Sequence, residues 1–114
     1  MKYCIIETRE LTLTEISLLK FLVPGRSEEV ANLKVVARCG CGKCPTVLFR
    51  QDHELEPLTG ESKNLAYYTG KNADGEIVAI DLYERNGEIA ELEASSLTGG
   101  DINVWPEINS LEKG

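Results

Sequence analysis

Three of the four cysteines lie within the six residues CGCGKC, positions 39–44. Cys41 and Cys44 are separated by two residues, which is the spacing of a zinc knuckle, and Gly42 allows a tight turn between them. Cys39 adds a third thiolate beside that pair. Structural zinc takes four ligands, chiefly thiolate and imidazole, in a tetrahedron. The segment therefore indicates a candidate metal site that needs one more ligand.

Two residues elsewhere in the chain are candidates for the fourth ligand. Cys4 is the remaining cysteine, and His53, the only histidine, lies in a polar stretch between two acids. Zinc sites are commonly built from two CxxC pairs, whereas this chain has one pair and single cysteines. The sequence leaves the choice between Cys4 and His53 open.

Two other interpretations of the cysteines compete with zinc. A CxxC oxidoreductase places its motif at the start of a helix, where the helix dipole lowers the thiol pKa. Here Pro45 and an expected strand follow Cys44, which argues against redox catalysis. Reduced cysteines also pack as small apolar residues in tight, glycine-rich connections. From sequence alone we favour such a turn without a cofactor, and we keep zinc as the alternative.

Composition limits the classes of partner. The chain has 114 residues, a net charge of −7 and 42% hydrophobic residues, which suits a single domain with its own core. The negative charge disfavours nucleic acid and anionic membranes and favours a basic protein partner. The N-terminal stretch has no apolar core of a signal peptide, and no apolar run is long enough to span a bilayer. We therefore expect a cytoplasmic protein.

The clearest helix is expected over residues 11–23. Thr12 and Glu15 have the Thr-x-x-Glu spacing of a capping box, in which each residue accepts a hydrogen bond from the other's backbone amide. Pro24 ends the helix, because proline disfavours helical geometry in the residue before it. A second, short helix is expected over residues 28–33.

The clearest strand pair is expected over residues 76–84 and 88–95. A three-residue loop, 85–87, places Glu84 opposite Glu88 and collects the apolar side chains on one face. In that register Asp81 pairs with Glu91, and Glu93 lies next to them on the other face. This arrangement predicts an outward, solvated acidic stripe that a basic partner could bind.

Shorter strands are expected over residues 34–38, 46–50 and 65–69, with a polar loop over 51–64. Trp105, the only tryptophan, is expected to fold back onto the core. We predict an α+β fold, one domain over residues 1–114, with one or two N-terminal helices packed on an antiparallel sheet of about four strands. The expected core residues are Ile16, Leu19, Leu22, Val36, Val47, Phe49, Val78, Ile80, Leu82 and Leu92.

Three stretches together resemble a family of small uncharacterised bacterial proteins. They are LTLTEISLLKFLVPGR (11–26), VVARCGCGKCPTV (35–47) and LYERNGEIAELE (82–93). The family's cysteine segment is often the more compact CxCGC, without a counterpart of Lys43, and Cys4 is not part of the pattern. The resemblance implies a single small α+β domain in which the cysteine segment belongs to the shared pattern. It implies no activity and no catalytic residues.

Three classes of function follow from these features. The first is a non-enzymatic interaction module, such as an immunity protein, whose acidic sheet face, Asp81, Glu91 and Glu93, meets a basic partner. The second is a small zinc-binding module that uses CGCGKC. An enzyme has the least support, because the chain has no nucleophile elbow, no phosphate-binding loop and no second histidine.

Overall fold

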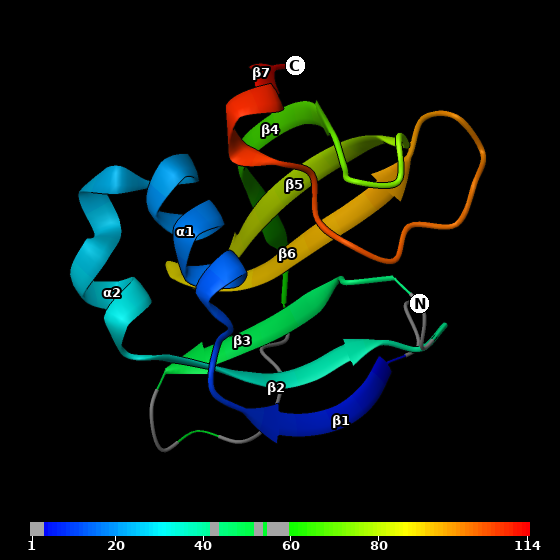
Figure 1. Cartoon of the computed structure of the whole chain (residues 1–114). Coiled ribbons are helices and arrows are strands. Elements are labelled where there is room, and N and C mark those ends of the chain that lie inside the picture. The colour runs from blue at the N-terminus through cyan, green and yellow to red at the C-terminus, as the bar shows by residue number, and fades with distance from the viewer. Residues whose placement is uncertain (1–3, 42–43, 52–53, 55–59) are drawn as a thin grey trace.

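The computed structural model describes residues 4–41, 44–51, 54 and 60–114 (Figure 1). Its elements follow in the order β1 (Cys4–Arg9), α1 (Leu13–Leu22), η1 (Pro24–Arg26), α2 (Ser27–Ala31), β2 (Leu33–Cys39), β3 (Val47–Gln51), β4 (Ser62–Lys71), β5 (Ile77–Arg85), β6 (Glu88–Ser96), η2 (Ile108–Ser110) and β7 (Glu112–Lys113). No helix in this part of the chain has the length and apolar character needed to cross a bilayer.

The strands form one antiparallel sheet in the order β1-β2-β3-β6-β5-β4-β7. Both α-helices and the C-terminal segment pack against the same apolar core over this sheet (Figure 1). The α+β class is confirmed, but the expected number of about four strands is wrong, because seven form within the described residues. β7 has only two residues, both charged, and therefore carries no apolar alternation that sequence reasoning could detect.

The core is close to the predicted one. Nine of the ten predicted residues are buried, and the tenth, Ile16, is partly buried against the same cluster. Val36 is fully buried but lies outside the main cluster. Trp105 is 9% exposed and belongs to the core, so the prediction that the tail folds back is confirmed. Burial of each large apolar side chain contributes about 1.5–3 kcal/mol, which makes this cluster the main source of stability.

The capping box at the start of α1 is confirmed. The amide of Glu15 donates to Thr12 Oγ1 at 3.1 Å, and the amide of Thr12 donates to Glu15 Oε1 at 2.8 Å. Glu15 is only 2% exposed, and both its oxygens also accept from the Arg9 guanidinium at 2.9 Å. The cap therefore also joins β1 to α1.

The β5–β6 hairpin differs from the prediction. Its loop is the two residues Asn86 and Gly87, both with positive φ (54° and 82°), so Arg85 rather than Glu84 pairs with Glu88. A bulge between Tyr83 and Glu84 then shifts the register by one residue. The shift keeps the apolar face intact, which is why alternation favoured the wrong loop.

The observed cross-strand partners follow from that bulge. Leu82 lies opposite Leu92, and Asp81 lies opposite Glu93 rather than opposite Glu91. The predicted separation of apolar and acidic faces therefore survives, although the predicted pairs do not.

The ion pair between Arg9 and the buried Glu15 yields a stability prediction. Replacement Glu15→Ala is expected to lower the free energy of unfolding by about 3 kcal/mol, because Arg9 loses the two-pronged contact with Glu15 and keeps only Glu7 as a charged partner among the described residues, and because the Thr12 amide loses its acceptor. Urea unfolding followed by circular dichroism measures the change.

Glu10→Ala is the matched control. The Glu10 side chain is 80% exposed and lies 3.5 Å from Lys34 Nζ, so its removal is expected to change stability by less than about 0.5 kcal/mol. Equal small losses for the two variants would contradict the role assigned to Glu15.

Candidate metal centre

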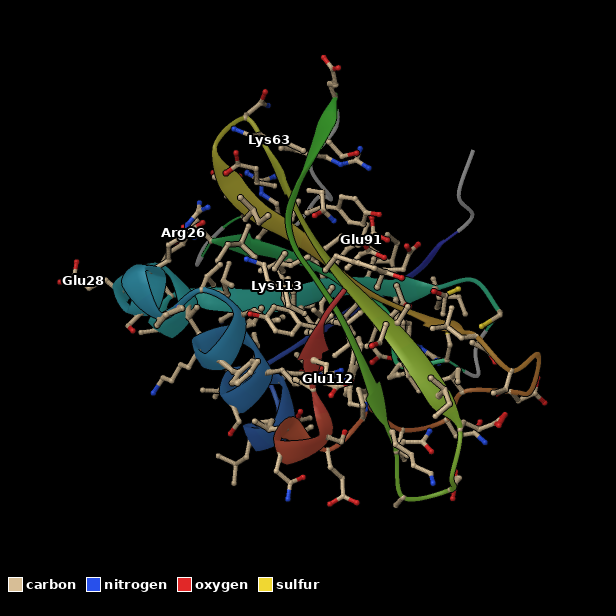
Figure 2. The ribbon with its side chains drawn as sticks, turned by 90° about the horizontal axis from the view of Figure 1, so that it is seen from above. Arg26, Glu28, Lys63, Glu91, Glu112 and Lys113 are labelled. Carbon is tan, nitrogen blue, oxygen red and sulfur yellow. The ribbon has the colours of Figure 1, made fainter. Side chains whose placement is uncertain are left out.

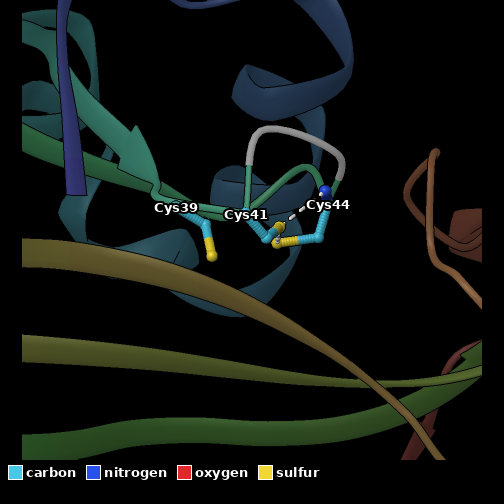
Figure 3. A group of neighbouring side chains, drawn as sticks. All are labelled: Cys39, Cys41 and Cys44. Carbon is cyan, nitrogen blue, oxygen red and sulfur yellow. Dashed lines mark hydrogen bonds between the residues drawn. The ribbon is translucent and has the colours of Figure 1, made fainter. Parts of the chain in front are cut away.

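The three cysteines of CGCGKC are close together in space (Figure 3). Their Sγ atoms all lie within 4.8 Å of one another, and the sulfurs of Cys41 and Cys44 are 3.4 Å apart. The amide of Cys44 donates to Cys41 Sγ at 3.3 Å. Cys41 is exposed, whereas Cys39 and Cys44 are half-buried. The structure thus gathers three of the five candidate ligands from the sequence at one point.

Thr46 positions this segment, and sequence reasoning missed it. The amide of Cys39 donates to the Thr46 carbonyl at 3.1 Å, which closes the turn between β2 and β3. The Thr46 hydroxyl is buried and accepts from the Ala94 amide of β6 at 2.9 Å. The turn is therefore fastened to the sheet through a side chain, and a threonine after Pro45 gave no specific signal of this role.

The surroundings of Cys39 favour its thiol form in the metal-free protein. A hydrogen bond from the Cys41 backbone favours the Cys39 thiolate, but burial and the neighbouring Cys41 and Cys44 outweigh it and raise the pKa of Cys39 to about 11. Three sulfurs at this distance cannot all carry charge without compensation. A divalent cation supplies that compensation and displaces protons as it binds.

The two remaining candidate ligands from the sequence are Cys4 and His53. The backbone of Cys4 lies directly opposite Cys39 in the β1–β2 register, so the strand pairing that would bring Cys4 near the cluster does form. The side chain of Cys4 is not described. His53 lies outside the described residues.

A polar pocket of about 260 Å³ adjoins the cluster. Cys44 lines it together with Arg9, Arg38 and Glu7. Glu7 lies between the two arginines, with Oε1 3.0 Å from Arg38 Nε and Oε2 3.3 Å from Arg9 Nε. Two arginines and the glutamate that pairs with both of them therefore line the pocket beside Cys44.

The predicted acidic stripe is only partly correct. Glu91 is only 5% exposed, and in Figure 2 it projects over the sheet, whereas Glu28 projects at the outer edge of the molecule. The expectation that Glu91 is a solvated side chain is therefore wrong. Asp81 and Glu93 are half-buried and directly opposite each other.

The Asp81–Glu93 pair is electrostatically unfavourable. Burial and the nearby charge of Glu93 raise the pKa of Asp81, although a 2.9 Å hydrogen bond from Asn64 Nδ2 opposes the shift. Like charges directly opposite each other on neighbouring strands destabilise a sheet. These two residues, rather than the predicted three, form the exposed part of the acidic face.

Removal of the Thr46 hydroxyl tests the positioning role. Thr46→Val is expected to lower the free energy of unfolding of the metal-free protein by about 1–3 kcal/mol, because the buried Ala94 amide loses its acceptor. Thr69→Val is the control: Thr69 is a half-buried strand residue, and no side-chain hydrogen bond of Thr69 occurs among the described residues. Urea unfolding compares the two, and losses that match within about 0.5 kcal/mol would contradict the role of Thr46.

The raised pKa of Asp81 predicts a pH-dependent gain in stability for Asp81→Asn. Because the folded protein binds the proton more tightly, the stability contributed by protonated Asp81 is present at low pH and is lost as pH rises through the raised pKa. The variant avoids this loss, so it is expected to be more stable at neutral pH by up to about 1 kcal/mol. The gain is expected to vanish below the ordinary aspartate pKa of 3.8.

Thermal unfolding of both proteins between pH 3 and pH 8 checks this prediction, because this range includes the pH values of about 3–5 at which aspartates titrate. Asp74→Asn, in an exposed turn, is the control and is expected to show no such trend. A gain for Asp81→Asn that is constant across this range would exclude the proposed cause.

No family model matches the chain, and no curated protein or solved structure matches it significantly. The resemblance to a family of small bacterial proteins stays a prediction, and the site is interpreted on its own geometry.

Proposed function

We propose that this protein is a small, non-enzymatic zinc-binding module in which Cys39, Cys41 and Cys44 hold one ion. The supporting observation is that the three Sγ atoms lie within 4.8 Å of one another. Zinc–sulfur bonds of about 2.3 Å in a tetrahedron place sulfurs about 3.8 Å apart, so small side-chain adjustments suffice to admit the ion.

The location of the cluster favours a structural role for the ion. It lies where β2 ends, in the turn that leads to β3, and its Cys39 belongs to β2 itself. A bound ion would tie this turn together and add to the fastening that Thr46 provides. We propose Cys4 as the fourth ligand, because its backbone lies opposite Cys39.

The proposal predicts one zinc per chain in protein purified without a metal-affinity column. Elemental analysis gives the metal content, and a thiol reagent is expected to react slowly until a chelator is added. Chelation is also expected to lower the melting temperature, because the free energy of metal binding adds to that of folding. Protein that contains no metal, takes up none and has fully reactive thiols would contradict the proposal.

Single substitutions assign the ligands. Cys39→Ser, Cys41→Ser and Cys44→Ser are each expected to abolish stoichiometric zinc, and Ser95→Ala, an exposed residue nearby, is expected to retain it. Cys4→Ser and His53→Ala decide the fourth position. Loss of zinc with Cys4→Ser alone would support a four-thiolate site, and loss with His53→Ala alone would replace Cys4 by the imidazole.

A second candidate function is binding of a basic protein partner, such as a toxin neutralised by an immunity protein. The observation that favours it is that Asp81 and Glu93 are like charges directly opposite each other, and a lysine or arginine from a partner would be attracted to both. A purified complex that survives the double neutralisation Asp81→Asn with Glu93→Gln would count against it. Glu91 is left unchanged in this test because it is buried.

A further inference from the structure

We propose that Cys41 and Cys44 form a peroxide-sensitive disulfide pair and that their oxidation releases the metal. The disulfide itself needs only the two thiols. The release of metal rests on the proposed zinc-binding function.

The geometry singles out this pair among the three cysteines. The sulfurs of Cys41 and Cys44 are 3.4 Å apart, and Figure 3 shows them side by side while the sulfur of Cys39 points elsewhere. A disulfide bond is about 2.05 Å long, so the two sulfurs, now 3.4 Å apart, need to approach each other by about 1.35 Å. Cys41 and Cys44 are also separated by two residues in the chain, a spacing that disulfides of redox proteins use.

The pair is open to a small oxidant. Cys41 is exposed, and both Cys41 and Cys44 line a pocket of about 220 Å³ together with Ser95 and Asp101. Cys39 does not line this pocket. Hydrogen peroxide is small enough to enter the pocket, where it meets Cys41 and Cys44 and not Cys39.

The chemistry balances with hydrogen peroxide as the oxidant. The Cys41 thiolate attacks one peroxide oxygen, the O–O bond breaks, and the departing hydroxide takes a proton to become water. Cys44 then attacks the resulting sulfenic acid, the S–O bond breaks, and the second oxygen leaves as water while the S–S bond forms. The two sulfurs lose two electrons in total, and peroxide gains them.

Oxidation and metal binding exclude each other at this site. A disulfide sulfur is not a thiolate, so the reaction removes two of the three ligands that the cluster supplies. In the zinc-loaded protein, the two protons that complete the waters come from solvent. One peroxide is therefore expected to release one zinc, and a reducing thiol is expected to restore the site.

The test treats the zinc-loaded full chain with equimolar peroxide and follows zinc with a chromophoric chelator. We expect complete zinc release, a mass lower by two hydrogens, and a Cys41–Cys44 crosslink in the non-reduced peptide map. Reduction with added zinc is expected to reverse all three changes. Retained zinc with unmodified thiols, sulfinic acid without a disulfide, a crosslink to Cys39 or Cys4, or a disulfide between chains would each overturn the proposal.

Metal-free protein separates this inference from the proposed function. In that form, Cys41→Ser and Cys44→Ser are each expected to lose the intramolecular crosslink. Cys39→Ser is expected still to form it, and the matched control Ser95→Ala, at an exposed residue nearby, is expected to form it at an unchanged rate. A protein that forms the crosslink but never binds zinc would refute the metal site and leave the pair intact. A protein that binds zinc but forms no such crosslink, with or without metal, would refute the disulfide pair and leave the metal site intact.

Discussion

One buried residue, Thr46, connects the cysteine turn to β6, through its backbone carbonyl on one side and its hydroxyl on the other. β3 and β6 share only two paired positions, Val47 with Leu92 and Leu48 with Glu91, so the ladder between the two halves of the sheet is short. The Thr46 hydroxyl extends this connection, because it accepts from the Ala94 amide at 2.9 Å and donates to the Ala94 carbonyl at 3.5 Å. The Thr46 carbonyl accepts from the Cys39 amide. The same residue therefore joins the sheet halves and sets where β2 gives way to the cysteine turn.

A second constraint acts from the other side of β2. β1 is an edge strand, held to the rest of the fold by its pairing with β2 and by the Arg9–Glu15 ion pair to α1. This contact matters to the cluster because β1 carries Cys4 opposite Cys39. Any ion that binds Cys4 would depend on an edge strand whose position is fixed partly by an ion pair between a half-exposed arginine and a buried glutamate.

Local signals in the sequence predicted much of the structure. The capping box of Thr12 and Glu15 and the proline after α1 are contacts between near neighbours, so their residue types and spacing suffice to predict them. The close approach of Cys39, Cys41 and Cys44 follows from their spacing in one turn. These features need no knowledge of tertiary packing.

The failures involve residues far apart in the chain. A bulge gives the β5–β6 hairpin the same apolar face as a longer loop, so alternation could not distinguish them. Glu91 belongs to the polar face by its parity, yet it is only 5% exposed where it lies between Tyr83 of β5 and Leu48 of β3. The hydrogen bond between Thr46 and Ala94 joins residues 48 positions apart in the chain, and a single threonine carries no sequence pattern from which such a partner could be predicted.

The proposed zinc and the proposed disulfide would stabilise the same turn to very different extents. A disulfide between Cys41 and Cys44 closes a loop of so few residues that its effect on the unfolded chain is small, about 2 kcal/mol by loop-closure entropy. Structural zinc in small domains contributes apparent binding energies of about 10–16 kcal/mol at neutral pH. Zinc would also bind Cys39 of β2 and Cys4 of β1, which lies opposite it, whereas the disulfide connects only two residues of the turn. Oxidation would therefore replace a tie between strands with a local one, so the expected consequence is a loosened β1–β2 edge rather than a merely altered turn.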